Sequence, residues 1–256
     1  MDFVATAIAV LIFLTIVIAG LAVERLAPAE AQPLAASGFN LCYTTFYIFA
    51  QALIAPALSI LTVAAVNAAG GGWVELPAAG AGFWLGFAAY ALTADLMEYL
   101  FHRAQHGVPA LWAMHSFHHS DAALNASTTS RHYWAEHGIK MLSIYLVTGM
   151  VFKAPPEVLG AYALLAYYNV FLHMNIRLGF GRWSFLLNSP QYHRLHHSAL
   201  REHFDRNFSA LFPIFDVVFG TYCPPRRGEY PPTGLDTGAK PKGLLDALLW
   251  PRRMSR

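Results

Sequence analysis

Charged residues are scarce in this chain. Asp, Glu, Lys and Arg make up 12% of its 256 residues, whereas hydrophobic residues make up 56%. The formal net charge of +2 is too small for a nucleic-acid-binding protein, and no basic run is interleaved with aromatic residues. The composition therefore favours a protein that places long apolar segments in a membrane, and we expect no nucleic-acid partner.

Cysteines and the common cofactor motifs are also nearly absent. Cys42 lies in an apolar run and Cys223 in a proline-rich tail, so the two cysteines indicate neither a disulfide framework nor metal ligands. The chain has no glycine-rich nucleotide motif, no haem-attachment or iron–sulfur motif, and no H-E-x-x-H protease motif. Electrons for a redox reaction would have to come from a separate donor.

Three apolar runs are long enough to predict membrane-spanning helices: Phe3 to Val23, Leu41 to Asn67 and Phe83 to Phe101. The first run is too long, and too poor in N-terminal positive charge, for a cleaved signal peptide. Pro56, inside the second run, can be tolerated in a spanning helix as a kink.

Two shorter apolar runs, 139–152 and 158–172, flank Pro155-Pro156 and predict a helical hairpin with its turn at the prolines. The alternative is one kinked span, which would leave His173 across the bilayer from the other histidines. Counting the hairpin, we expect about four transmembrane helices.

Histidine, in contrast, is clustered. Nine of the twelve histidines lie in H-R-A-Q-H, in two copies of H-x-x-H-H, and at one isolated position: His102, His106, His115, His118, His119, His173, His193, His196 and His197. Residues three and four apart lie on one face of a helix, so each cluster presents two or three nitrogen donors together. One metal ion rarely takes more than about six ligands. Nine imidazoles therefore suit two ions better than one, and iron, zinc, copper and nickel all accept imidazole.

Other interpretations of these histidines remain open. A lone residue such as His173 is more often a buried structural histidine, and a pair such as His102/His106 also occurs on solvated faces. His132, His137 and His203 lack the spacing and are expected at the surface or behind the ligands. A metal transporter would place its ligands along a path within the spans, and a haem protein would use single histidines on separate helices. Clusters at the ends of spans favour an enzyme.

The motifs resemble those of a known family. D-L-M-E-Y-L-F-H-R-A-Q-H from Asp95, L-W-A-M-H-S-F-H-H-S, L-H-M-N, Q-Y-H-R-L-H-H and D-R-N-F-S-A-L-F-P-I-F-D-V-V-F-G-T occur in order over about residues 95–221. They resemble the fatty acid hydroxylase/sterol desaturase superfamily of integral-membrane di-iron enzymes. The resemblance implies that the nine clustered histidines hold two irons and that Asp95, Asn207 and Asp216 fall on family positions.

The resemblance also implies an activity. We expect an oxygen-dependent monooxygenase-type enzyme that uses dioxygen to hydroxylate or desaturate a lipid of the fatty-acyl, sterol or related isoprenoid kind. An iron pair supplies the strong oxidant needed to break an unactivated C–H bond, so no catalytic residue is expected beyond the ligands. Hydroxylation and desaturation share the first hydrogen abstraction, and the sequence does not separate them. The electron donor would be a ferredoxin, a cytochrome or a reductase.

Several polar residues are candidates for orienting the ligands, because a metal-bound histidine usually donates its other N–H to a carboxylate or carbonyl. These residues are Asp95, Glu98, Asn169, Asp205 and Asn207. Asp95 lies seven residues before His102, on the same helical face and about 10 Å deeper. Ion pairing with Arg103 or Arg206 is the structural alternative. Asn169 and Tyr133 stand at positions where some relatives of the resembling family carry further histidines.

The distribution of basic residues predicts orientation. Of the 17 Lys and Arg residues, 12 follow His173, which places the histidine side in the cytoplasm. The glycine-rich link 69–82 carries only Glu75 and would lie outside. We therefore expect an all-α, multi-span helical bundle with a cytoplasmic helical cap that holds the di-metal site, in a bacterial inner membrane.

The expected organisation has three parts: N-terminal spans and loops at 1–82, a catalytic region at 83–222, and an irregular tail at 223–256. Near the end of the tail, the segment from Leu244 to Trp250 has a short amphipathic pattern. It is predicted to lie in the membrane interface.

Overall fold

Three long helices form the N-terminal part of the protein. The computed structural model describes residues 3–254, in which helix α1 covers Phe3–Glu24, α2 Leu34–Ala68 and α3 Gly80–Gly107. These helices contain the three long apolar runs. Each extends beyond its apolar run at one or both ends: α2 begins directly after Pro33, and α3 ends at Gly107, two residues before Pro109.

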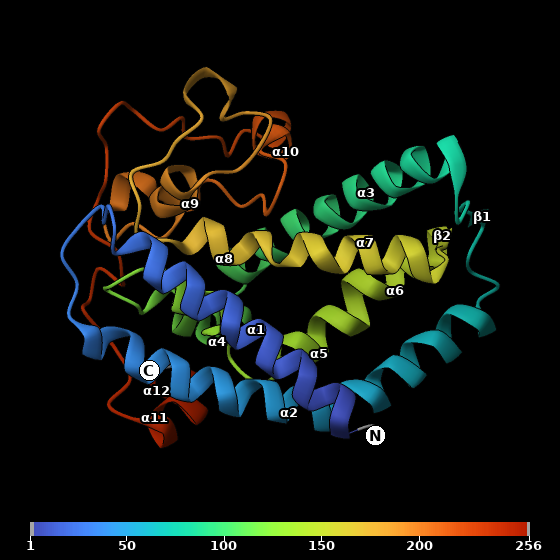
Figure 1. Cartoon of the computed structure of the whole chain (residues 1–256), viewed down its shortest axis with the longest axis horizontal. Helices are drawn as coiled ribbons and strands as arrows, with labels where there is room; N and C mark the ends of the chain where they lie inside the picture. Colours follow the sequence, from blue (N-terminus) through green and yellow to red (C-terminus); the bar gives the residue numbers. More distant parts are fainter. Residues whose placement is uncertain (1–2, 255–256) are drawn as a thin grey trace.

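The two shorter apolar runs form a hairpin. One arm consists of α5 (Glu136–Lys140), the π-helical η2 (Met141–Tyr145) and α6 (Leu146–Val151), and the other of α7 (Pro156–Ala166) and α8 (Tyr168–His173). Strand β2 (Phe152–Lys153) follows α6 and pairs in parallel with β1 (Val74–Glu75). Figure 1 shows β1 and β2 at one end of the molecule and α8 returning to the other end, beside α9. His173 therefore comes back to the end where the other histidines lie.

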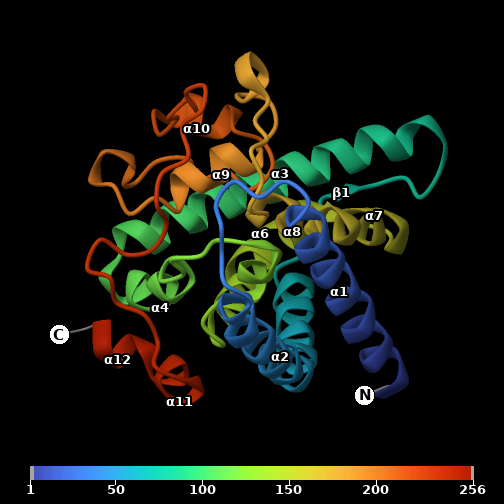
Figure 2. The same ribbon diagram turned by 60° about the vertical axis from the view of Figure 1, so that its left-hand side comes forward.

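Short helices and loops cover that end of the bundle. In chain order these elements are α4 (Pro109–His119), η1 (Ala126–Ser130), η3 (Gly181–Trp183), α9 (Pro190–His196), η4 (Arg201–His203), α10 (Ile214–Phe219), α11 (Leu244–Leu248) and α12 (Trp250–Met254). Figure 2 shows α4, α9, α10, α11 and α12 on the left, the side on which α3 continues into α4. The fold is thus mostly helical, with long helices at one side and a compact cap of short elements at the other.

A buried carboxylate ties the first helix to this cap. Glu24, at the end of α1, is 4% exposed and accepts hydrogen bonds from the backbone N–H groups of Ala126 and Asn175. Gly20 allows the helix to approach closely, since an added Cβ would lie 3.0 Å from the Cβ of Ala126. The cap is therefore attached directly to the apolar helices.

One described helix, α2, is long and apolar enough to cross a membrane by length and composition. Only 6% of its most apolar stretch is buried inside the protein. Residues 10–24 form a shorter apolar helical stretch.

The amphipathic segment of the tail is packed against the cap. Trp250 is completely buried beside Phe117 and Tyr43, and its indole N–H donates to the hydroxyl of Ser116 at 2.9 Å. Leu245 on the opposite side is 71% exposed. The tail is thus anchored by its tryptophan, and its contact with a membrane stays a prediction.

Candidate metal centre

The nine clustered histidines come together as two adjoining groups. The five-histidine group contains His102, His106, His115, His119 and His196, and the four-histidine group contains His118, His173, His193 and His197. Within each group, one ring nitrogen per residue lies within 4.8 Å of the others. The rings of His119 and His197 stack at 4.4 Å between centroids, so the two groups share a boundary. Their role as ligands stays a prediction, but their convergence is a feature of the fold.

Both H-x-x-H-H motifs are divided between the groups in a related way. In α4, His115 and His119 belong to the five-histidine group, while His118 belongs to the other. His193 of α9 and His197, the residue that follows α9, belong to the four-histidine group. His196 of α9 belongs to the five-histidine group. Residues i and i+4 are about 40° apart around a helix, whereas adjacent residues are about 100° apart. Each motif therefore serves two sites at once.

The nitrogen spacing in the four-histidine group fits a metal ion. The Nε2 atoms of His173 and His193 are 3.0 Å apart, those of His193 and His197 3.2 Å, and those of His118 and His173 3.3 Å. Two nitrogens that bind one ion at about 2.1 Å are separated by about 3.0–3.4 Å. In the five-histidine group, the Nε2 atoms of His102 and His115 are likewise 3.0 Å apart.

Buried nitrogens without a hydrogen-bond partner point to the same conclusion. Among the described residues, the Nε2 atoms of His106, His119 and His196 are buried and have no such partner. A buried polar atom without a partner calls for an explanation such as an ion. A metal ion bound at Nε2 would satisfy all three.

The opposite ring nitrogens are held by the backbone. His102 and His196 use Nδ1 toward the carbonyl oxygens of Phe208 and Arg206, at 2.7 and 2.8 Å. His173 uses Nδ1 toward the carbonyl oxygen of Asn169 at 2.7 Å. A proton on Nδ1 leaves the Nε2 lone pair free for a metal.

Two of those carbonyls belong to an irregular loop that Asp216 organises. The Asp216 carboxylate is fully buried and accepts hydrogen bonds from the N–H groups of Phe208 and Ser209 and from the hydroxyls of Tyr192 and Thr221, all at 2.7–2.8 Å. Asn207 adopts φ +60° in this loop. Its side chain accepts from the Cys223 N–H and donates to the carbonyl oxygens of Tyr192 and Cys223. Asn207 and Asp216 therefore act through the shape of the loop.

The side chains of Asp95 and Asn169 hydrogen-bond to backbone groups. The Asp95 carboxylate accepts hydrogen bonds from the N–H groups of Leu211 and Phe212, both at 2.8 Å, and not from a histidine. Asn169 supports His173 with its backbone carbonyl, while its side-chain amide donates to Ala166 at 3.3 Å. Sequence patterns carry no information about which backbone carbonyl a ring will meet.

Of the remaining candidates, Asp205 contacts a clustered histidine and Glu98 does not. The Asp205 carboxylate lies 3.3 Å from Nδ1 of His106, although the aspartate side chain is 73% exposed. Glu98 instead forms an ion pair with Lys140 at 2.8 Å. The ion pair of Glu98 is thus made with a lysine of α5, and not with Arg103 or Arg206 as the alternative had it.

Glu136 is the site residue that sequence reasoning missed. It is 1% exposed, and its carboxylate lies 3.4 Å from Nδ1 of His115 and 3.2 Å from Nδ1 of His132. Burial by itself raises the pKa of Glu136, but hydrogen bonds from both rings outweigh it and hold that pKa well below its usual range. The four-residue spacing of His132 and Glu136 was the available signal. The same three residues form a further candidate metal-binding group.

The other histidines occupy different environments. His132 stacks on His118 with 4.3 Å between ring centroids, so it borders the four-histidine group. His203 was expected at the surface or behind the ligands; it is buried, and its ring hydrogen-bonds with the Ser198 hydroxyl at 2.9 Å. Tyr133 points elsewhere, since its hydroxyl donates to the Leu248 carbonyl.

Burial keeps the clustered rings neutral. Desolvation, followed by repulsion from neighbouring imidazoles, lowers the pKa of His118, His119 and His197 well below the usual value. The pKa of His115 is lowered to about 4, chiefly by burial. Since a metal binds neutral imidazole, the site is in the ligating form at neutral pH.

Two cavities reach the histidines from different sides. The inner pocket, about 260 Å³, is lined by histidines of both groups and by apolar side chains such as Phe13, Leu165 and Leu211. The outer pocket, about 280 Å³, reaches only the five-histidine group and is lined by Trp112 and Asp205 among others. The inner pocket therefore lies among the apolar helices and the outer pocket within the cap.

This arrangement defines a class of protein: one with a histidine-rich group of candidate metal ligands at the end of an apolar helical bundle. The fatty acid hydroxylase family model matches residues 87–221, more than half of the chain and the region that holds every clustered histidine. The chain belongs to this family, which confirms the family predicted from the sequence motifs.

Related proteins of known activity cover parts of the same region. The chain is 32% identical to human alkylglycerol monooxygenase over 146 residues, which are 54% of this chain and 31% of the relative. It is 28% identical to the ornithine lipid hydroxylase of Rhizobium tropici over 158 residues, 62% of this chain and 47% of the relative. A very-long-chain aldehyde decarbonylase of Arabidopsis thaliana is 28% identical over 138 residues, 50% of this chain and 21% of the relative.

The chain thus spans about a third of the length of the alkylglycerol monooxygenases that it matches. No solved structure matches it.

Proposed function

We propose that this protein is a membrane-bound di-iron oxygenase that hydroxylates or desaturates a lipid. The observation that carries the proposal is the convergence of nine histidines into two adjoining groups beside a pocket among apolar helices. When bound, two irons would activate dioxygen and so supply the strong oxidant that is needed to break a C–H bond. Relatives named as a monooxygenase and a lipid hydroxylase support hydroxylation in particular.

The protein's own residues would hold and shield this centre. The carbonyls of Phe208, Arg206 and Asn169 keep three rings in the orientation that presents Nε2. Apolar side chains of the inner pocket, such as Phe13 and Leu165, would hold the substrate chain and exclude water. Electrons would come from an external donor, a ferredoxin, cytochrome or reductase.

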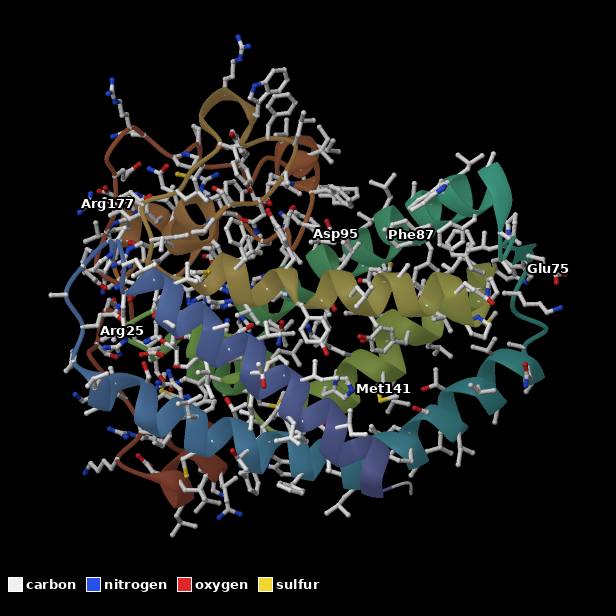
Figure 3. All side chains as sticks on the ribbon, viewed as in Figure 1. Arg25, Glu75, Phe87, Asp95, Met141 and Arg177 are labelled. Atoms are coloured by element: carbon white, nitrogen blue, oxygen red, sulfur yellow. The ribbon has the colours of Figure 1, made fainter. Side chains whose placement is uncertain are left out.

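The proposed setting is a bacterial inner membrane, with about four spans and the cap in the cytoplasm. Figure 3 shows Arg25 and Arg177 at the cap end and Glu75 at the opposite end, which agrees with a cytoplasmic cap. Reporter fusions after Ala69 and after Arg256 are expected to report opposite sides of the membrane. The same side for both would overturn this topology.

Substitution of single ligands tests the metal assignment. His118→Ala and His196→Ala each remove one proposed ligand, from the four- and five-histidine groups respectively. Each change is expected to abolish turnover and lower the iron content of the purified protein. Full activity in either variant would refute the assignment. Iron must be supplied during expression, since zinc binds such sites more tightly by the usual affinity order.

Lipid analysis tests the reaction. Lipid extracts of cells with and without the gene, grown under labelled oxygen gas, are expected to differ by a lipid that carries a labelled hydroxyl group. A new double bond would identify desaturation instead. Unchanged lipids in cells that contain the iron-loaded protein would contradict an oxygenase function.

A further inference from the structure

The inner pocket contains an ion pair among its apolar residues. Glu98 of α3 and Lys140 of α5 lie 2.8 Å apart, and both side chains line this pocket. They are 18% and 24% exposed, so each is only partly covered by protein. Removing two charges from water is costly, and an ion pair at such a place is weak evidence for stability. Ionisable residues within an apolar bundle more often indicate function.

The ion pair has a fixed position relative to the histidine groups. Glu98 precedes His102 by four residues in α3, and Lys140 follows Glu136 by four residues in α5. Four residues advance a helix by about 6 Å. Both helices therefore place the ion pair about one turn away from the five-histidine group, to which Glu136 is linked through His115.

Three phenols extend the polar surface beside the ion pair. Tyr47, Tyr145 and Tyr162 line the same pocket. Among the described residues, none of their hydroxyls takes part in a hydrogen bond with another residue. Lys140 uses one of its three N–H donors for Glu98. The pocket thus combines an apolar surface with a group of donors and acceptors that the fold leaves free.

We propose that Glu98, Lys140 and the three phenols form a subsite for a neutral polar group of the lipid substrate, a hydroxyl or an amide. This inference rests on the proposed function. The pair carries no net charge, so a carboxylate or phosphate that approaches Lys140 would also meet the negative charge of Glu98. A hydroxyl or an amide can donate to the carboxylate and accept from the lysine or a phenol.

The position of this subsite selects the carbon that reacts. The subsite and the five-histidine group are separated by about one helical turn along α3 and line the same pocket, so only a short stretch of the lipid lies between them. The C–H bond presented to the metal centre is therefore near the polar end of the lipid, and not in the middle or at the end of its chain.

Binding measurements test the subsite without turnover. The iron-loaded protein in nanodiscs would be titrated with three tritiated probes: 1-O-hexadecylglycerol, which is a neutral diol, palmitate, which is an anion, and hexadecane, which has no polar group. The wild-type protein is expected to bind the diol most tightly. The double variant Glu98→Leu/Lys140→Met is expected to bind the diol about 10- to 100-fold more weakly and hexadecane unchanged.

The chain offers a matched control. Lys153 and Glu75 form another lysine–glutamate pair, at 3.4 Å and with 69% and 75% exposure. Glu75→Leu/Lys153→Met makes the same chemical change away from the pocket and is expected to leave all three affinities unchanged. Tyr162→Phe removes one hydroxyl and keeps the ring, so it tests the subsite even if the double variant does not fold. We expect this variant to bind the diol about 3- to 10-fold more weakly than the wild type.

The outcomes separate the two proposals. Unchanged diol binding in both pocket variants, or equal weakening of all three probes, would overturn the subsite. Palmitate as the tightest ligand and the one most weakened would also overturn it, because the subsite would then be anionic. Oxygen-dependent modification of a lipid without diol preference would leave the proposed function standing. Diol preference in a protein that modifies no lipid would leave the subsite standing.

Discussion

The Glu136 carboxylate is expected to determine how tightly one metal ion is held. Glu136→Gln keeps the shape of the side chain but removes its charge and replaces one acceptor oxygen with an amide donor. Changes to groups that orient a ligand typically cost 10- to 100-fold in metal affinity. Because the contacts with His115 and His132 are 3.4 and 3.2 Å long, at the weak end of the N–H···O range, we expect the lower end, about tenfold.

The assay is metal retention under a graded chelator series. His115 belongs to the five-histidine group, so the variant should lose metal from that group about tenfold more readily, and total metal should fall first by about half. Glu157→Gln provides the control, since Glu157 is exposed at the start of α7. Retention equal to that of the wild type, or equal loss from both groups, would refute the reasoning.

Three other changes test the loop, the tail and the protonation state. Asp216→Asn would place an amide nitrogen against N–H and O–H donors, and we expect it to lower the free energy of unfolding by about 2–3 kcal/mol. Denaturation in mixed micelles measures this change, and a stability equal to that of the wild type would contradict the role of Asp216. Trp250→Ala is expected to lower the free energy of unfolding by about 3–5 kcal/mol. Trp183→Ala, at a position that is 53% exposed, is expected to lower it by less than about 0.5 kcal/mol. Burial lowers the pKa of His115 and of His173 to about 4, below the unfolded value of about 6.5. The unfolded chain therefore binds more protons between these values, so the metal-free protein should keep full stability above about pH 6.5 and lose it as the pH falls toward 4; a melting temperature independent of pH over this range would rule this out.

Much of the centre follows from local spacing. Histidines three or four residues apart must share a helical face, so the H-x-x-H-H motifs were sufficient to predict clustered nitrogen donors. The family was predicted from the resemblance of these motifs and their order to those of a known family. The apolar runs and Pro155-Pro156 were likewise sufficient to predict the long helices and a hairpin, because hydrophobic length and proline act within a few residues of the chain.

Which residues contact one another across the cap was decided by the tertiary structure. Each H-x-x-H-H motif is divided between two groups because α4 and α9 face each other across the centre, and the order of residues does not encode that pairing. The support for His102, His173 and His196 comes from backbone carbonyls, which every residue possesses and no motif marks. The ion pair of Glu98 and Lys140 joins residues that are 42 positions apart. Spacing along a helix therefore selects which rings can bind metal, whereas the packing of helices selects which rings share an ion and what lies beside them.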